Sequence, residues 1–257
     1  MTSIQGVIKL FGDDQVSDVR FLPSGLGGVK IAHALFYSRH YYPRSDDDEL
    51  RNAIAVKRGH ETLYKYDIYL FADGGAEGFH CIVAVPFSAL GREVFFTLHK
   101  ASAGSRPLYR RIDLAGALDV LAKGATEQSR IAVRALEVPL GSEGNVDRLW
   151  LSGRDVVNST AYRLLPKMLE VLPGEADNPR KCDPESCQFA YEGEAGTSFR
   201  LTADNQGNYS FHLRKDPGLL TYFARLLRFF YAHGITEDIH AWPWRGGSAS
   251  ALAEKES

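Results

Sequence analysis

The chain has 257 residues, of which 44% are hydrophobic and 24% charged, a composition that excludes intrinsic disorder and indicates a globular protein. Its formal net charge of −2 excludes the basic balance typical of a nucleic-acid-binding chain, although it is compatible with a local basic face. The three cysteines are too few for a disulfide framework, the first residues lack a signal-peptide pattern, and the apolar runs are too short to span a bilayer. We therefore expect a cytoplasmic protein that does not enter a membrane and carries no disulfides.

Short apolar runs and alternating patterns predict mainly strands in the first hundred residues. The expected strands cover residues 7–11, 19–22, 29–38, 64–71, 79–86 and 92–100, and the last two are expected to form a hairpin. For 29–38, a short helix is the alternative. A short helix is also expected from Asp46 onward, because the acidic residues there could cap it.

Helices and strands are both expected in the second part of the chain. Apolar residues at helical spacing predict helices over 112–125 and 218–233, and a third is expected between Asn158 and Val171, interrupted by Pro166. Strands are expected over 131–140 and 146–151. Alternation over 198–203 and 209–214 predicts a hairpin.

This order of elements predicts an α+β fold with mostly antiparallel sheets and about three to four helices. Two lobes are one option: an N-terminal α+β lobe over 1–141 and a C-terminal α+β lobe over 142–245. The residues 246–257 are then expected to form a flexible tail. A single domain over 1–245 is the alternative.

A glycine-rich loop is the first candidate site. Gly25, Gly27 and Gly28 could let backbone N–H groups converge on an anion, and Lys30 could add a positive charge. The spacing matches neither the phosphate-binding loop nor the dinucleotide-binding fingerprint. A tight connection between two strands is the simpler interpretation.

A histidine pair is the second candidate. If Val85 pairs with Val94 in the expected hairpin, His80 lies opposite His99 on the neighbouring strand. Two imidazoles at that distance could act as acid and base on a phosphodiester, with Lys100 stabilising the developing charge. The alternative is two histidines at a solvated sheet edge.

A basic segment is the third candidate, since residues 100–134 carry seven basic and three acidic side chains. Arginine beside an aromatic residue suits single-stranded nucleic acid, through phosphate contact and base stacking. A solvated surface is the alternative. The residues expected to bind nucleic acid are Lys100, Arg106, Tyr109, Arg110, Arg111, Arg130 and Arg134.

Aromatic residues near the C-terminus are the fourth candidate. Phe229 and Phe230 lie in the last expected helix, and Trp242 and Trp244 follow it. They could form a docking patch, because tryptophan is favoured as an interface anchor, or they could pack within the chain.

No metal or cofactor is predicted. Four residues separate Cys182 from Cys187, a spacing that zinc could use, but no further pair of ligands completes a structural site.

The sequence lacks a serine nucleophile elbow, a zinc-binding helix motif and an EF-hand loop. The absence of these motifs favours a non-enzymatic function. With the uneven charge and the surplus aromatic residues, this favours a non-catalytic binding subunit of a larger intracellular assembly, with protein partners and a nucleic-acid contact through the basic segment. One alternative is an enzyme of phosphodiester or nucleotide chemistry that uses the histidine pair. The other is a protein–protein interaction domain without nucleic acid. Neither the partner nor the oligomeric state follows from the sequence.

Overall fold

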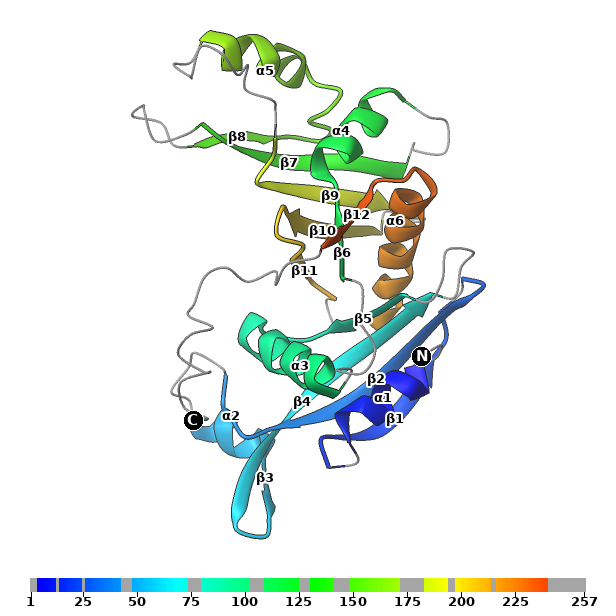
Figure 1. The fold of residues 1–257 in the computed structure, drawn as a ribbon, viewed down its shortest axis with the longest axis vertical. Coiled ribbons are helices and arrows are strands. Elements are labelled where there is room, and N and C mark those ends of the chain that lie inside the picture. The colour runs from blue at the N-terminus through cyan, green and yellow to red at the C-terminus, as the bar shows by residue number, and fades with distance from the viewer. Residues whose placement is uncertain are drawn as a thin grey trace. The chain divides into compact units, whose positions relative to one another are not determined.

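The computed structural model describes residues 4–12, 14–24, 26–42, 48–73, 80–101, 109–124, 130–140, 148–171, 183–193, 197–213 and 216–239. Within these ranges, six α-helices accompany twelve strands whose pairings are antiparallel (Figure 1). The α+β class and the antiparallel sheets are therefore confirmed, whereas the chain has more helices than the three to four expected. Within the same ranges, no helix combines the length and the apolar character needed to cross a lipid bilayer.

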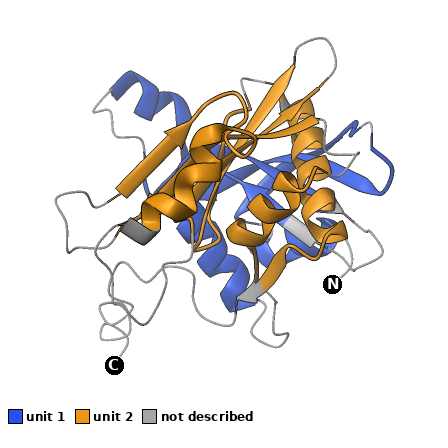
Figure 2. Cartoon of the chain, turned by 90° about the horizontal axis from the view of Figure 1, so that it is seen from above, with its two compact units in different colours: residues 1–107 blue, residues 108–257 orange. Residues whose placement is uncertain are grey.

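The chain divides into two compact units, unit 1 over residues 1–107 and unit 2 over residues 108–257 (Figure 2). The boundary expected near residue 141 thus falls inside unit 2. Whether the units are independent domains stays a prediction, and each is described by itself below.

Unit 1 is built on a five-stranded antiparallel sheet with the order β1-β2-β4-β3, in which β5 also pairs with β4. The long strand β4 pairs with β2 along one edge, and β3 and β5 share its other edge. The elements in chain order are α1 (Ile4–Phe11), β1 (Val16–Leu22), β2 (Val29–Ser38), α2 (Asp48–Ile54), β3 (Ala55–Arg58), β4 (Glu61–Asp73), β5 (His80–Ala84) and α3 (Ser88–Ala101).

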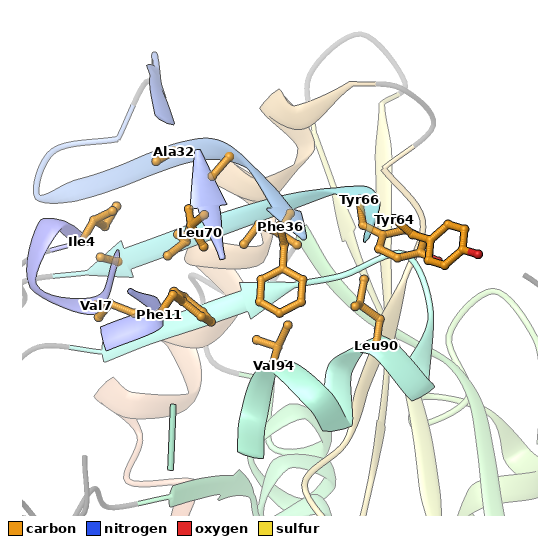
Figure 3. Close-up of a cluster of buried hydrophobic side chains, with 14 residues drawn as sticks. Ile4, Val7, Phe11, Ala32, Phe36, Tyr64, Tyr66, Leu70, Leu90 and Val94 are labelled. Carbon is orange, nitrogen blue, oxygen red and sulfur yellow. The ribbon is translucent and has the colours of Figure 1, made fainter. Parts of the chain in front are cut away.

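The core of unit 1 lies between this sheet and the helices α1 and α3 (Figure 3). Alternation along β2 and β4 places every second side chain on the core face, among them the fully buried Phe36 and Leu70. Phe11 of α1 packs edge-to-face on Phe36, with 5.7 Å between the ring centroids. Leu90 and Val94 of α3 complete the cluster.

Two segments of unit 1 that were expected to be strands are helices. The run 7–11 belongs to α1, which buries Ile4, Val7 and Phe11 at intervals of three and four residues. The run 92–100 belongs to α3, which buries Leu90 and Val94 one turn apart. A short apolar run fits the period of a helix as well as that of a strand. These two segments form helices because one face of each helix is then buried against the sheet.

Unit 2 contains a second five-stranded antiparallel sheet, with the order β11-β10-β9-β7-β8, and a separate pair of strands, β6 and β12. The expected helices and the expected hairpin are present, while β6, β9 and β12 were not predicted. The elements in chain order are β6 (Tyr109–Ile112), α4 (Leu114–Ala122), β7 (Ile131–Pro139), β8 (Arg148–Ser152), α5 (Thr160–Val171), β9 (Ser186–Glu192), β10 (Ser198–Asp204), β11 (Tyr209–Phe211), a 3₁₀ helix (Pro217–Leu219), α6 (Leu220–Ala232) and β12 (Thr236–Ile239).

One face of the sheet in unit 2 is buried against helices. The helix α6 contacts β9 and β10, and α4 contacts β7. Phe230 of α6 meets Phe189 of β9 edge-to-face at 5.0 Å between ring centroids, and both side chains are fully buried. The opposite face of the strands carries polar side chains such as Gln188, Arg200 and Thr202, none of which is buried.

Candidate interaction site

Among the described residues, β8 ends the sheet of unit 2 and has β7 as its one partner strand (Figure 1). Leu149 and Leu151 lie opposite the buried Val138 and Leu136 of β7, so they belong to the buried face of the sheet. The alternation of a strand therefore directs Trp150, between them, to the other face. There its side chain is 58% exposed, which is unusual for the largest apolar residue type.

The charges beside Trp150 compensate one another. Trp150 lies opposite Glu137 of β7, and Arg148 donates to the Glu137 carboxylate at 2.7 Å. Ser186 of β9 donates to the other carboxylate oxygen at 3.0 Å, and Glu185 lies 3.7 Å from the same Arg148 nitrogen. The hydrogen bond from Arg148, followed by the one from Ser186, lowers the pKa of Glu137 below its ordinary value. The exposed indole is thus flanked by one arginine that pairs with neighbouring carboxylates of the same unit.

The helix α5, which follows β8 in the chain, adds two more exposed apolar side chains. It buries Leu165 and Leu169, and its other side exposes Leu164 by 46% and Met168 by 47%. These two residues are four positions apart and therefore neighbours on the helix surface. Together with Trp150 they are the exposed large hydrophobic residues in the described part of unit 2.

A polar cluster in unit 1 joins the end of β2 to α3. Glu93 accepts hydrogen bonds from the buried Ser38 hydroxyl at 2.6 Å and from the Tyr42 hydroxyl at 2.5 Å. The Tyr66 hydroxyl accepts from the Tyr42 backbone N–H and donates to the His40 carbonyl oxygen. Burial, reinforced by the hydrogen bond to Glu93, raises the pKa of the Tyr42 hydroxyl. The polar groups of this cluster hydrogen-bond to one another. The cluster therefore has the features of a network that holds α3 to the end of β2 rather than of a reactive site.

The glycine-rich loop connects the adjacent antiparallel strands β1 and β2. The Ser24 hydroxyl donates to the carbonyl oxygens of Leu26 and Val29, and Gly28 has a φ of +79°, which favours glycine. Gly27 is exposed, Lys30 is exposed on β2, and Gly25 lies outside the described residues. The loop has the form of a tight strand connection, and its anion-binding role stays a prediction.

The hairpin on which the histidine pair depended is absent. His80 lies on β5 and pairs with Asp73 of β4, whereas His99 is exposed on the helix α3. A residue in a helix has no cross-strand partner, so the expected register between these two histidines was wrong. Lys100 is exposed beside His99 at the end of α3. The geometric argument for acid–base catalysis by this pair is therefore lost.

The residues of the basic segment are distributed over several elements. Tyr109, Arg110 and Arg111 belong to β6, Arg130 directly precedes β7, and Arg134 belongs to β7, whereas Arg106 lies outside the described residues.

Two of these arginines are engaged by carboxylates. Arg111 donates to Glu237 at 2.9 Å, and Arg134 donates to Glu192. The guanidinium of Arg110 lies 5.8 Å from the centroid of the Tyr231 ring. The nucleic-acid interface stays a prediction, and phosphates would have to compete with these carboxylates.

The aromatic residues near the C-terminus separate into two groups. Phe230 is fully buried in the core of unit 2, which leaves it no surface for docking. Phe229 is half-buried and packs on His233, with 4.6 Å between ring centroids. Trp242 and Trp244 lie outside the described residues, so their docking role stays a prediction.

Of the two cysteines considered for zinc, Cys187 is buried on β9, and Cys182 lies outside the described residues. In the described part of the chain, no three side chains of histidine, cysteine, aspartate or glutamate gather where they could hold a metal ion.

Comparison of the sequence with models of known protein families finds no match, and comparison with curated proteins finds none either.

The candidate residue that sequence reasoning missed is Trp150. The segment 146–151 was correctly expected to be a strand, and its pattern contains the signal. Leu149 and Leu151 share one face of a strand, so the residue between them must lie on the other face. A tryptophan on the polar side of a strand is the feature that could have identified the site.

Proposed function

We propose that the protein is a binding subunit of a larger assembly and that it contacts a protein partner through β8 and α5. The observation that carries this proposal is the exposure of Trp150. Tryptophan is enriched among the residues that dominate binding energy in protein interfaces. Covering its exposed apolar surface would remove that surface from water, which favours association.

The charges and exposed apolar side chains of unit 2 favour protein over nucleic acid as the partner. Arg148, Arg134 and Arg111 all bond to carboxylates of unit 2, so their positive charges are already compensated. A polyanion gains its affinity mainly from uncompensated basic groups. The apolar side chains Leu164 and Met168 on α5 instead suit an apolar protein surface.

The test is the native size of the full chain in cell extracts. We expect the tagged wild-type chain to migrate well above the mass of a single chain and the Trp150→Ser variant to migrate as a single chain. Phe21→Ser is the matched control, because Phe21 is an aromatic residue of similar exposure, 53%, on the end strand β1 of unit 1. This control should migrate like the wild type.

Nuclease treatment of the same extracts separates the two classes of partner. A complex held by protein contacts should survive the treatment, whereas a complex held by nucleic acid should fall apart. A wild-type chain that migrates as a single chain, or a complex that Trp150→Ser leaves unchanged, would contradict the proposal.

A further inference from the structure

Resting on the proposed function, we propose that the partner at β8 is a second copy of this chain. The two β8 strands would pair antiparallel about a two-fold axis that passes next to Trp150. The two sheets of unit 2 would then join into one continuous sheet across the interface. Two features of β8 support this pairing, the regular course of its edge and the self-complementary order of its side chains.

Three other end strands, β1, β3 and β11, carry features that discourage pairing with another chain. In β1 the register shifts between Ser17 and Arg20, and Asp18 in that interval has a φ of +53°. Asp18 and Arg20 are also exposed charges. The strand β3 ends in the exposed Lys57 and Arg58, and β11 is only three residues long. Irregular, charged and short edges are the usual protections against edge-to-edge association.

Within the residues that the structure describes, β8 is neither irregular nor highly charged along its length. Its register with β7 runs without a shift from Arg148 to Ser152, and none of its five residues is buried. Its single charge, on Arg148, is compensated by Glu137 and Glu185 on the same sheet. An end strand directs the N–H and C=O groups of alternate residues away from its neighbour, where they can pair with a further strand.

The side chains of β8 match their own reverse order. In an antiparallel pair centred on Trp150, Leu149 of one copy faces Leu151 of the other on the buried side of the sheet. Trp150 faces Trp150 on the open side, and Arg148 faces Ser152, so no like charges oppose one another. Aromatic pairs and apolar pairs across strands stabilise a sheet, whereas like charges destabilise it. A symmetric interface of this kind is the common form of a homodimer.

The size of the strand sets the expected affinity. Five residues from each copy form an interface below the standard size of stable complexes, so we expect a dissociation constant on the order of micromolar. Sedimentation velocity of the purified full chain should therefore show a monomer at low concentration and a dimer whose fraction rises with concentration.

A charge at the axis should disrupt the dimer. In Trp150→Lys the aromatic pair is lost and two ammonium groups face each other, so we expect the dissociation constant to rise about tenfold or more. Phe21→Lys is the matched control and should leave the dimer unchanged. Thermal unfolding of both variants checks that the fold survives, which we expect because both side chains are exposed.

Cross-linking reports the register directly. Opposed residues of antiparallel strands have Cα atoms about 4.5–5.5 Å apart, within the range of a disulfide. Trp150→Cys should therefore give a disulfide-linked dimer under mild oxidation. In Ser152→Cys, the two new thiols would lie four residues apart along the strands, roughly 13 Å, too far for a disulfide. The native cysteines are common to both samples.

The outcomes separate this inference from the proposed function. A purified chain that stays monomeric at high concentration, or equal cross-linking by Trp150→Cys and Ser152→Cys, would overturn the pairing of β8 with itself. If a Trp150-dependent complex persists in extracts despite a monomeric purified chain, the proposed function stands with a different protein at β8. If the purified chain dimerises at high concentration while the extracts show a single chain, β8 pairs with itself and the larger assembly is wrong. If both measurements show a single chain, both proposals are wrong.

Discussion

At the scale of single residues, the hydroxyl of Tyr42 makes stability depend on alkaline pH. Burial and the hydrogen bond to Glu93 raise its pKa in the folded chain above the value of about 10 for an exposed tyrosine. Above that pH the unfolded chain releases this proton while the folded chain retains it. The folded state then binds more protons than the unfolded state, so the free energy of unfolding falls as pH rises through and beyond 10.

We therefore expect Tyr42→Phe to lower the free energy of unfolding near pH 8 by about 1–2 kcal/mol, because a hydrogen bond to a carboxylate is lost. The same variant should lose less stability than the wild type between pH 8 and pH 11. Urea unfolding at both pH values measures the two effects. A wild type and a Tyr42→Phe variant with the same alkaline loss of stability would show that Tyr42 is not responsible.

The neighbouring carboxylate provides a matched pair of variants. Glu93→Gln removes the charge that supports the raised pKa of Tyr42 and should also reduce the alkaline loss of stability. Glu61→Gln changes a carboxylate of the same unit whose ion pair in the described part of the chain is with the exposed Arg39 at 3.2 Å. Exposed ion pairs contribute little, so this control should change the free energy of unfolding by less than about 1 kcal/mol.

At the scale of secondary-structure elements, α4 shows how one polar side chain sets a helix start. Asp113 precedes the helix, and its carboxylate accepts a hydrogen bond from the backbone N–H of Gly116 at 3.0 Å. We expect Asp113→Ala to lower the free energy of unfolding by about 1 kcal/mol, because this N–H loses its partner. Asp119→Ala is the control, since Asp119 is exposed within the same helix and alanine favours helices. Equal losses in urea unfolding would exclude a capping role for Asp113.

Helices and strands could be predicted from the sequence where either the helical or the strand period dominates the pattern of apolar residues. The hairpin of β10 and β11 and the helix α6 were expected because strict alternation and a stripe of apolar residues leave little ambiguity. The segments 7–11 and 92–100 were wrongly expected to be strands, because each apolar run is short and its burial depends on the distant strands β2 and β4. The strand β9 was missed, since neither its pairing with β7 nor its pairing with β10 can be read from its own residues.

The candidate site at Trp150 could be predicted in part, because some of its features are local in the sequence and others are not. The alternation around Trp150 is local, so its place on the open face of a strand could be predicted from the sequence. That β8 is an end strand depends on the order of the whole sheet, which local patterns do not contain. The ion pairs of Arg111 with Glu237 and of Arg134 with Glu192 also join different strands. A count of basic residues along the chain therefore overestimated the positive charge that the segment presents.

At the scale of the whole molecule, the two units differ from the lobes expected from the sequence in the assignment of the strand β7. The strand β7 pairs with β8 on one side and β9 on the other, and α4 packs on it. A boundary near residue 141 would separate β7 from both of its neighbours. The boundary at residues 107 and 108 keeps the whole sheet within one unit.

Two fragments of nearly the same C-terminal region test which boundary holds. We expect the fragment 108–257 to fold and to unfold cooperatively, because it retains all five strands of its sheet and the helices that bury Phe189 and Phe230. The fragment 142–257 lacks β7 and α4, which leaves β8 without a partner and exposes one edge of β9. We expect it to show no cooperative transition in heat or urea unfolding followed by circular dichroism. Cooperative unfolding of 142–257 would contradict the assignment of β7 to unit 2 and would favour the boundary near residue 141.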